Sequence, residues 1–222
     1  MAAIIWDATG DRFFETGVDH GVLYPQNSDG TYETGVAWNG LTSVSASPEG
    51  AEPTDLWADN IKYATLRSAE TFGATIEAYT YPDEFAECDG SATIEAGVFV
   101  GQQSRKSFGF CYRTKVGSDT DTDASKEKLH VIYNATASPS ERSYETINDS
   151  PSAITFSWEI TTTPVNVTGH KPTSELTFNL WELTAAKKKA LEDKLYGTDG
   201  TPGSDPTLPD PDTLLGIIAA AT

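Results

Sequence analysis

Residues 155–161 read TFSWEIT, a segment in which polar and apolar side chains alternate with a period of two. Phe156, Trp158 and Ile160 fall on one side, and the four polar residues fall on the other. Successive side chains of a β-strand point to opposite faces of a sheet, so the pattern predicts an antiparallel strand with one buried and one solvated face. This segment alone indicates a β-protein.

Further segments of the same kind extend along the chain. The clearest are Phe108–Val116, Leu129–Asn134, Leu176–Leu180 and Thr75–Tyr81, and the weaker ones are Arg12–Glu15, Val36–Val44, Ile61–Arg67 and Thr93–Val100. Clusters of Gly, Pro, Asp and Asn separate them, as is typical of all-β proteins. We therefore expect a mainly β fold, an antiparallel β-sandwich or barrel.

Two helices are expected within this β-rich chain. A short one over residues 82–88 begins with Pro82, which suits a first helical turn, and stops at Asp89-Gly90. A flanking one over residues 185–196 has Thr184 as its N-cap and Gly197 after its last turn. Lysines 187–189 come early in this helix, where positive charge opposes the helix dipole. We therefore expect packing of its apolar side chains on the sheet to hold it.

Three polar segments are expected to lack regular structure. Residues 45–60 contain two prolines and Trp57 and predict a long loop, and residues 117–128 predict a polar connector. The segment after Gly197 is rich in Pro, Gly and Asp and precedes the apolar sequence LLGIIAAAT. We therefore divide the chain into a β-sandwich domain over residues 1–197 and a flexible arm with an apolar docking tip over residues 198–222.

The charge of the chain excludes one class of function. The sequence has 222 residues, with 33 acids against 15 Lys and Arg, for a net charge of −18. Binding to nucleic-acid phosphates depends on Lys and Arg that release counterions, so autonomous nucleic-acid binding is excluded. Residues 1–100 hold 17 acids and three bases. Such an imbalance indicates that one surface carries most of the field.

The sequence carries no membrane or export signal that we recognise. The N-terminus has no basic region followed by an apolar run, and no segment approaches the length of a membrane helix. Cys88 and Cys111 form no C-x-x-C motif or metal-ligand spacing, so we expect two reduced, partly buried thiols in a cytoplasmic product.

No catalytic motif, cofactor fingerprint or metal-ligand pattern is found, so we expect neither catalytic residues nor a cofactor. The segment Asp119–Asp123 is similar to the start of a calcium loop, but Ala124 and His130 replace the Gly and Glu that such a loop needs. Two further clusters allow a plain and a sharper interpretation. Acids at 83, 84, 87 and 89 either cap a helix or supply the carboxylates of a glycosidase, and lysines 187–189 form either a solvated face or a dock for an acidic neighbour.

Several distinctive blocks resemble the major tail protein of long non-contractile-tailed bacteriophages. They are YETGVAWNGLTSVSASPEGAEPTDLWADNIKY (32–63), GATIEAYTYPDEFAECDG (73–90), CYRT (111–114) and YETINDSPSAITFSWEITTTPVNVTGHKPTS (144–174). The resemblance covers most of residues 13–197 and is weaker after Gly197. It implies a non-enzymatic tail-tube subunit that forms stacked six-fold rings, through whose lumen viral DNA is ejected into the bacterial host. Implied partners are copies of the chain, tape-measure protein, and tail terminator and distal tail proteins. The implied location is the virion tail, assembled in the host cytoplasm.

This resemblance and the residues together define two candidate sites. For contact with the next ring we expect the 45–60 segment, with Pro48, Glu49, Pro53, Asp55 and Trp57, because its prolines limit freedom and Trp57 is an apolar anchor. For an acidic lumen that repels DNA phosphates we expect Glu77, Glu95 and Glu159, on the polar sides of their strands.

Three other functions stay open at this stage. A carbohydrate-binding or adhesive module would place Trp38, Trp57 and Trp181 on an exposed platform. A glycosidase-like enzyme would use Glu84 or Glu87. A tube subunit of a contractile injection machine would share the expected fold.

Overall fold

The computed structural model describes residues 4–50, 52–147, 149 and 152–221. Most of the regular structure consists of antiparallel strands, which confirms the predicted mainly β class. The strands are β1 (Phe13–Pro25), β2 (Val36–Trp38), β3 (Leu41–Ala46), β4 (Glu49–Gly50), β5 (Pro53–Ala58), β6 (Ile61–Arg67), β7 (Glu70–Thr71), β8 (Gly73–Ala78), β9 (Ala92–Glu95), β10 (Val98–Val100), β11 (Phe108–Ser118), β12 (Asp121–Ala137), β13 (Phe156–Thr162) and β14 (Glu175–Asn179). The helices are α1 (Phe85–Cys88), α2 (Ala185–Tyr196), α3 (Pro211–Ala220) and a 3-10 turn at Leu180–Glu182.

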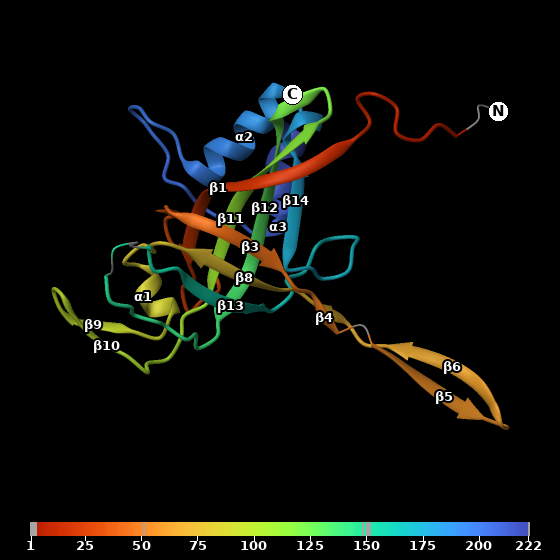
Figure 1. Ribbon diagram of the computed structural model, residues 1–222, viewed down its shortest axis with the longest axis horizontal. Coiled ribbons are helices and arrows are strands. Elements are labelled where there is room, and N and C mark those ends of the chain that lie inside the picture. Colours follow the sequence, from red (N-terminus) through yellow and green to blue (C-terminus); the bar gives the residue numbers. More distant parts are fainter. Residues whose placement is uncertain (1–3, 51, 148, 150–151, 222) are drawn as a thin grey trace.

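The main sheet curls into a barrel-like sandwich. Its strand order is β2-β1-β11-β12-β13-β8-β3, and β14 pairs with β12 beside this path. The two end strands, β2 and β3, are consecutive in the chain and are joined by Asn39-Gly40. An added Cβ at Gly21 of β1 would lie 2.5 Å from the Leu41 side chain of β3, so β3 packs closely against β1. Figure 1 shows β3 and β8 crossing in front of β11 and β12.

An aromatic cluster fills the interior of this curled sheet. Strand β13 contains the TFSWEIT segment from Phe156 on, and it buries Trp158 and Ile160 while Glu159 stays exposed, as the alternation predicts. The centroid of the Trp38 ring lies 4.5 Å from the centroid of the Phe85 ring and 5.5 Å from that of the Trp158 ring. Tilted and edge-to-face contacts of this kind add to the free energy gained by burial.

Helix α2 covers the opposite face of the sheet. Its N-cap Thr184 accepts a hydrogen bond from the Lys187 backbone N–H, and Leu191 and Leu195 are buried in a second core. The Tyr24 hydroxyl of β1 donates to the Leu195 carbonyl at 2.6 Å. The helix with unfavourable dipole electrostatics is therefore held by packing on the sheet, as predicted.

The C-terminal segment differs from the flexible arm that its composition predicted. Helix α3 begins after Asp210, whose side chain accepts a hydrogen bond from the Thr213 N–H. Leu208, Leu214 and Ile218 lie in the same core as α2. The spacing of Leu214 and Ile218 places both on one side of a helix, so the apolar tip packs on its own chain. Thr222 lies outside the described residues.

Most other predicted elements are correct in type but differ in extent, and one predicted connector is wrong. Strand β1 continues to Pro25, well beyond the predicted strand Arg12–Glu15. The sequence pattern missed this extension because two shifts in the register of β1 with β11 interrupt the alternation of side chains. The predicted strand Val36–Val44 is two strands, and Thr93–Val100 is the β9–β10 hairpin. The predicted connector 117–128 is wrong, since most of it forms the ends of β11 and β12, which pair through backbone groups despite polar side chains. Helix α1 is shorter than the predicted 82–88.

Candidate assembly surfaces

A two-stranded hairpin, β5–β6, projects from the body of the molecule (Figure 1). Its cross-strand pairs include Thr54 with Leu66 and Leu56 with Ala64. Lys62 Nζ lies 2.8 Å from Asp55 Oδ1, which also accepts a hydrogen bond from the Thr65 hydroxyl at 2.9 Å. Short strands β4 and β7 pair at its base. The prediction of an irregular loop over residues 45–60 is therefore wrong, although Ala51 lies outside the described residues.

The hairpin carries a group of large apolar side chains that are 42–70% exposed: Leu56, Trp57, Ile61, Tyr63 and Leu66. Single exposed apolar residues are common, but five on one short hairpin favour contact with a partner. An isolated two-stranded hairpin is also only marginally stable in water. A partner that covers these side chains would therefore stabilise the hairpin as well as the contact.

The five residues predicted for inter-ring contact all lie along this projection. Glu49 is in β4 and pairs with Thr71, Pro48 precedes it, and Pro53, Asp55 and Trp57 are in β5. Their role in assembly stays a prediction. Sequence reasoning missed the apolar residues of β6 as part of the same surface. The alternating segment 61–66 was a usable signal, because its turn residues Asp59-Asn60 would pair it with β5.

Two other projecting segments expose apolar side chains. Ile4, Ile5 and Trp6 precede β1 on an extended N-terminal segment, and Ile94 and Phe99 lie on the β9–β10 hairpin. Figure 1 shows both segments extending away from the main sheet. The molecule therefore has apolar projections in more than one direction.

Strands β3, β8 and β13 share a polar face. The register aligns Ser43 with Glu77 and Ser157 in one row, and the next row contains Glu159. Ser43 Oγ donates to Glu77 Oε2 at 2.8 Å. These three strands contain no Lys or Arg. Two of the three predicted lumen residues thus share one face, whereas Glu95 lies on the separate β9–β10 hairpin.

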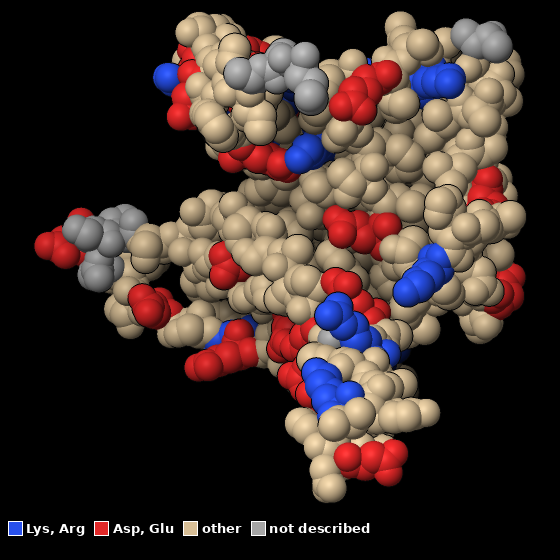
Figure 2. All heavy atoms as spheres, turned by 90° about the vertical axis from the view of Figure 1, so that its right-hand side faces the viewer, with Lys and Arg blue, Asp and Glu red and all other residues tan. Residues whose placement is uncertain are grey.

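The acidic charge is not gathered into one field on the face that Figure 2 displays. Acidic and basic side chains are interspersed there, including around the base of the projecting hairpin. Elsewhere, Lys106 Nζ contacts Glu33 Oε1 at 2.6 Å and Glu87 Oε2 at 3.3 Å. The hydrogen bond that Lys106 donates to Glu33 raises the pKa of Lys106, against the opposing effect of burial. Bases of the second half of the chain therefore neutralise acids of the first.

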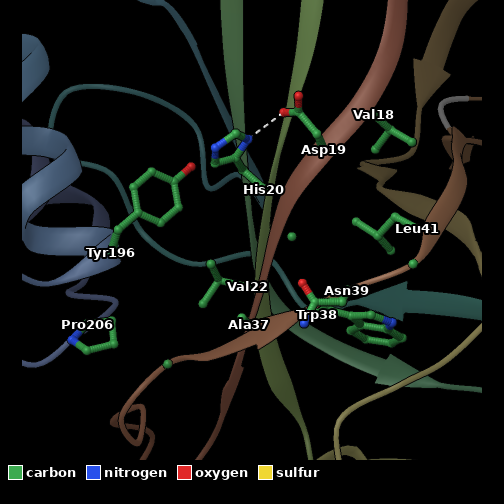
Figure 3. A pocket seen from close by; sticks show the side chains of 13 residues that line it. Val18, Asp19, His20, Val22, Ala37, Trp38, Asn39, Leu41, Tyr196 and Pro206 are labelled. Carbon is green, nitrogen blue, oxygen red and sulfur yellow. Dashed lines mark hydrogen bonds and ion pairs between the residues drawn. The ribbon is translucent and has the colours of Figure 1, made fainter.

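An apolar groove of about 710 Å³ opens beside β1 and β2 (Figure 3). Val18, Val22 and Leu41 line it, together with other residues of β1, β2, the Asn39-Gly40 turn, Tyr196 and Pro206. The only ion pair drawn among these side chains joins His20 Nδ1 and Asp19 Oδ1 at 2.8 Å. The groove is thus largely apolar, with one hydrogen-bonded polar pair at its side.

Two of the acids around α1 contact basic side chains. Asp89 is bound by Arg105 and by Arg142, and Glu87 contacts Lys106. Within the described ranges, no group of three or more His, Cys, Asp or Glu side chains could hold a metal ion. Of the calcium-like segment, Asp119 accepts a hydrogen bond from the Gly10 N–H and Asp121 accepts from Ser125.

The burial of Trp38 does not suit a carbohydrate-binding module. Trp38 is only 2% exposed, so the platform of Trp38, Trp57 and Trp181 is not formed.

Cys88 and Cys111 are free and buried, and burial raises their pKa to about 12 and about 11. Such thiols are inert at neutral pH. None of the described helices combines the length and apolar character needed to span a bilayer.

Comparison with known proteins leaves the function open. No protein-family profile matches the chain, and no curated protein matches it. Solved structures that match include the baseplate of the anti-feeding prophage (8% identity, TM-score 0.35, covering 79% of this chain and 98% of that one). Two others are the sheath/tube terminator and the sheath-tube complex of the PVC extracellular contractile injection system. The terminator is 9% identical, with a TM-score of 0.33, and the match covers 79% of this chain and 99% of that one. The sheath-tube complex is also 9% identical, with a TM-score of 0.30, and the match covers 78% of this chain and 93% of that one. At these TM-scores the matches do not establish a function.

Proposed function

We propose that this chain is a structural subunit of a phage-type tail tube, which assembles with copies of itself into stacked rings. The observation that carries the proposal is the β5–β6 hairpin, whose large apolar side chains are exposed in the single chain. In a monomer, such a projection would leave apolar side chains exposed to water, whereas in an assembling subunit a neighbouring copy can bury them. The sequence blocks that resemble a tail-tube family add independent support.

The polar face of β3, β8 and β13 is the proposed lining of the tube. It presents Glu77 and Glu159 among Ser and Thr side chains, and these strands contain no basic residue. A surface of this type repels phosphates and offers them no ion-pair partner, so DNA would slide past it without binding. Rings would then act as a passive conduit, with no catalytic step.

Electron microscopy of the purified full-length chain tests this function. We expect rings or tubes of uniform width, and we expect the double variant Trp57→Ser, Tyr63→Ser to stay monomeric, because its hairpin has lost two aromatic anchors. Circular dichroism should be unchanged, since both side chains are exposed. Leu215→Ser is the matched control, because Leu215 is an exposed apolar residue on α3. Assembly of the double variant to the wild-type extent, or a persistent wild-type monomer that binds glycans, would count against the proposal.

A further inference from the structure

The apolar groove beside β1 lies at the opposite end of β3 from the projecting hairpin. Leu41, the first residue of β3, lines the groove, and the chain leaves the other end of β3 at Ala46 towards β4 and the hairpin. A six-residue strand spans about 20 Å. Figure 1 shows β3 running from the β1 side of the molecule towards the hairpin. The hairpin therefore points away from the groove of its own chain.

This placement favours contact between separate copies. When a projection and a hollow lie at opposite ends of one molecule, copies that repeat head to tail bring each projection to the next hollow. Such a heterologous contact repeats without limit along a line, as stacking of subunits requires. The symmetry of the arrangement therefore fits the proposed assembly.

The hairpin tip and the groove also match in chemistry. Trp57 and Ile61 near the tip are 69% and 62% exposed. The groove offers Val18, Val22 and Leu41 as apolar contacts. Aromatic side chains that enter apolar pockets are the common anchors of protein interfaces.

Charge at the edge of the groove is complementary as well. Lys62 is the cross-strand partner of Trp57, and its side chain is 50% exposed despite its ion pair with Asp55. At the groove, the Asp19 carboxylate is 35% exposed, with His20 Nδ1 at 2.8 Å from one oxygen and Lys115 Nζ at 3.6 Å from the other. A docked Trp57 would carry the Lys62 ammonium towards an acceptor of opposite charge, which would fix the orientation of the contact.

A second hollow among the described residues fits the hairpin tip less well. It lies beside the base of the hairpin and is lined in part by the charged residues Arg67, Glu70, Lys171 and Glu175. Burial of an apolar tip there would remove these charges from water without a partner for each. The apolar groove is therefore the better receptor.

From these observations we infer that the groove beside β1 and β2 receives the Trp57 end of the β5–β6 hairpin of a second copy of this chain. The inference rests on the proposed function, because it names the surface through which subunits stack. It adds a receptor site, which neither the sequence nor the comparisons indicated.

Cross-linking between two variants, each with one added cysteine, tests the contact. Ala58→Cys places a thiol beside Trp57 on the hairpin, and Ala37→Cys places one on the groove wall; both positions are exposed. The native cysteines are buried and react slowly. The two variants are mixed before assembly, treated with a short bis-maleimide, and analysed by mass spectrometry. Ala96→Cys, on the exposed β9–β10 turn, replaces Ala37→Cys in the control.

We expect the Ala58→Cys and Ala37→Cys pair to give at least tenfold more cross-linked product than the control pair. Equal yields from the two pairs would overturn the groove as receptor. Electron microscopy of the same samples separates the two proposals. Tubes without the specific cross-link would contradict only the groove as receptor, whereas absence of any assembly would contradict the proposed function. As a second readout, Ala37→Arg should abolish stacking while Ala96→Arg should not, and normal tubes from Ala37→Arg would also overturn the inference.

Discussion

At the scale of single residues, a charged cluster joins the sheet to helix α2. Arg113 of β11 is 7% exposed, and its guanidinium donates to Glu192 Oε1 of α2 at 2.8 Å. Lys188 Nζ of α2 donates to Glu127 Oε2 of β12 at 3.0 Å. Burial acts to raise the pKa of Glu127, but the hydrogen bond from Lys188 and the charge of Arg113 outweigh it and lower that pKa. The ionised carboxylate therefore stabilises the docked helix.

This lowered pKa predicts an acid-dependent loss of stability. A carboxyl group whose pKa falls on folding contributes stability above its ordinary pKa of 4.5, and this contribution disappears as the pH falls through the folded value. We expect Glu127→Gln to lower the free energy of unfolding by about 1 kcal/mol at pH 7, since the group is partly exposed. The difference from wild type should shrink between about pH 5 and pH 3.

Urea unfolding at several pH values measures this difference. Glu95→Gln is the control, because Glu95 is exposed and forms no ion pair among the described residues. Its effect on stability should be small throughout the pH range. A constant deficit of Glu127→Gln from pH 7 to pH 3 would show that the ionised carboxylate does not act as described.

At the scale of elements, the C-terminal helix α3 belongs to the core of the sheet. Leu214 is fully buried against the cluster that contains Leu191 and Leu195 of α2. Thr168 donates to Asp212 in the first turn of α3 at 2.6 Å, which ties the helix to the loop before β14. Helix α3 therefore covers apolar surface that the sheet and α2 would otherwise expose to water.

We expect Leu214→Ala to lower the free energy of unfolding by about 3 kcal/mol, as removal of a buried leucine usually does. Leu215→Ala, one position along the same helix, removes the same atoms from a side chain that is 38% exposed and should cost much less. Chemical denaturation of the two full-length variants makes the comparison. If the two variants were equally stable, α3 would not be packed on the sheet in solution.

At the scale of the whole molecule, the fold combines a closed core with segments that project from it. The sheet and its helices bury two apolar clusters, while the β5–β6 hairpin, the β9–β10 hairpin and the N-terminal segment extend outward (Figure 1). The acidic residues of the polar sheet face have no basic neighbours on their strands. Under the proposed function, the projections would contact neighbouring subunits and the acidic sheet face would repel phosphate.

The proposed acidic lining makes a prediction for DNA passage. We expect Glu77→Lys together with Glu159→Lys to slow DNA release from particles built of the variant, because lysines on a lining would attract phosphates. The delay should become smaller as salt is raised, since salt screens these charges. Release is followed by fluorescence of a DNA-binding dye.

A charge-matched control separates position from net charge. Glu141→Lys together with Glu145→Lys makes the same change in charge at exposed positions outside strands β3, β8 and β13. The control should release DNA at the wild-type rate. Equal delays in both double variants, or no delay in either, would contradict an acidic lining on this face.

Local sequence patterns correctly predicted the elements that are specified by neighbouring residues, such as an alternating strand or a capped helix. The alternation of TFSWEIT identified β13 and its buried Trp158, and Thr184 with Gly197 identified the ends of α2. The same reasoning missed α3, because prolines and aspartates before Leu214 are typical of a linker. It also treated residues 45–60 as a loop, because β5 gains its structure from pairing with β6.

The sequence by itself determined that this is an acidic, mainly β chain with one capped helix, because charge and side-chain periodicity are properties of neighbouring residues. Only the tertiary structure decided that Trp38 is buried, that Glu77 and Glu159 share a face without Glu95, and that an apolar groove lies opposite an apolar hairpin. These features depend on contacts between strands far apart in the chain, whose pairing and register no local pattern specifies.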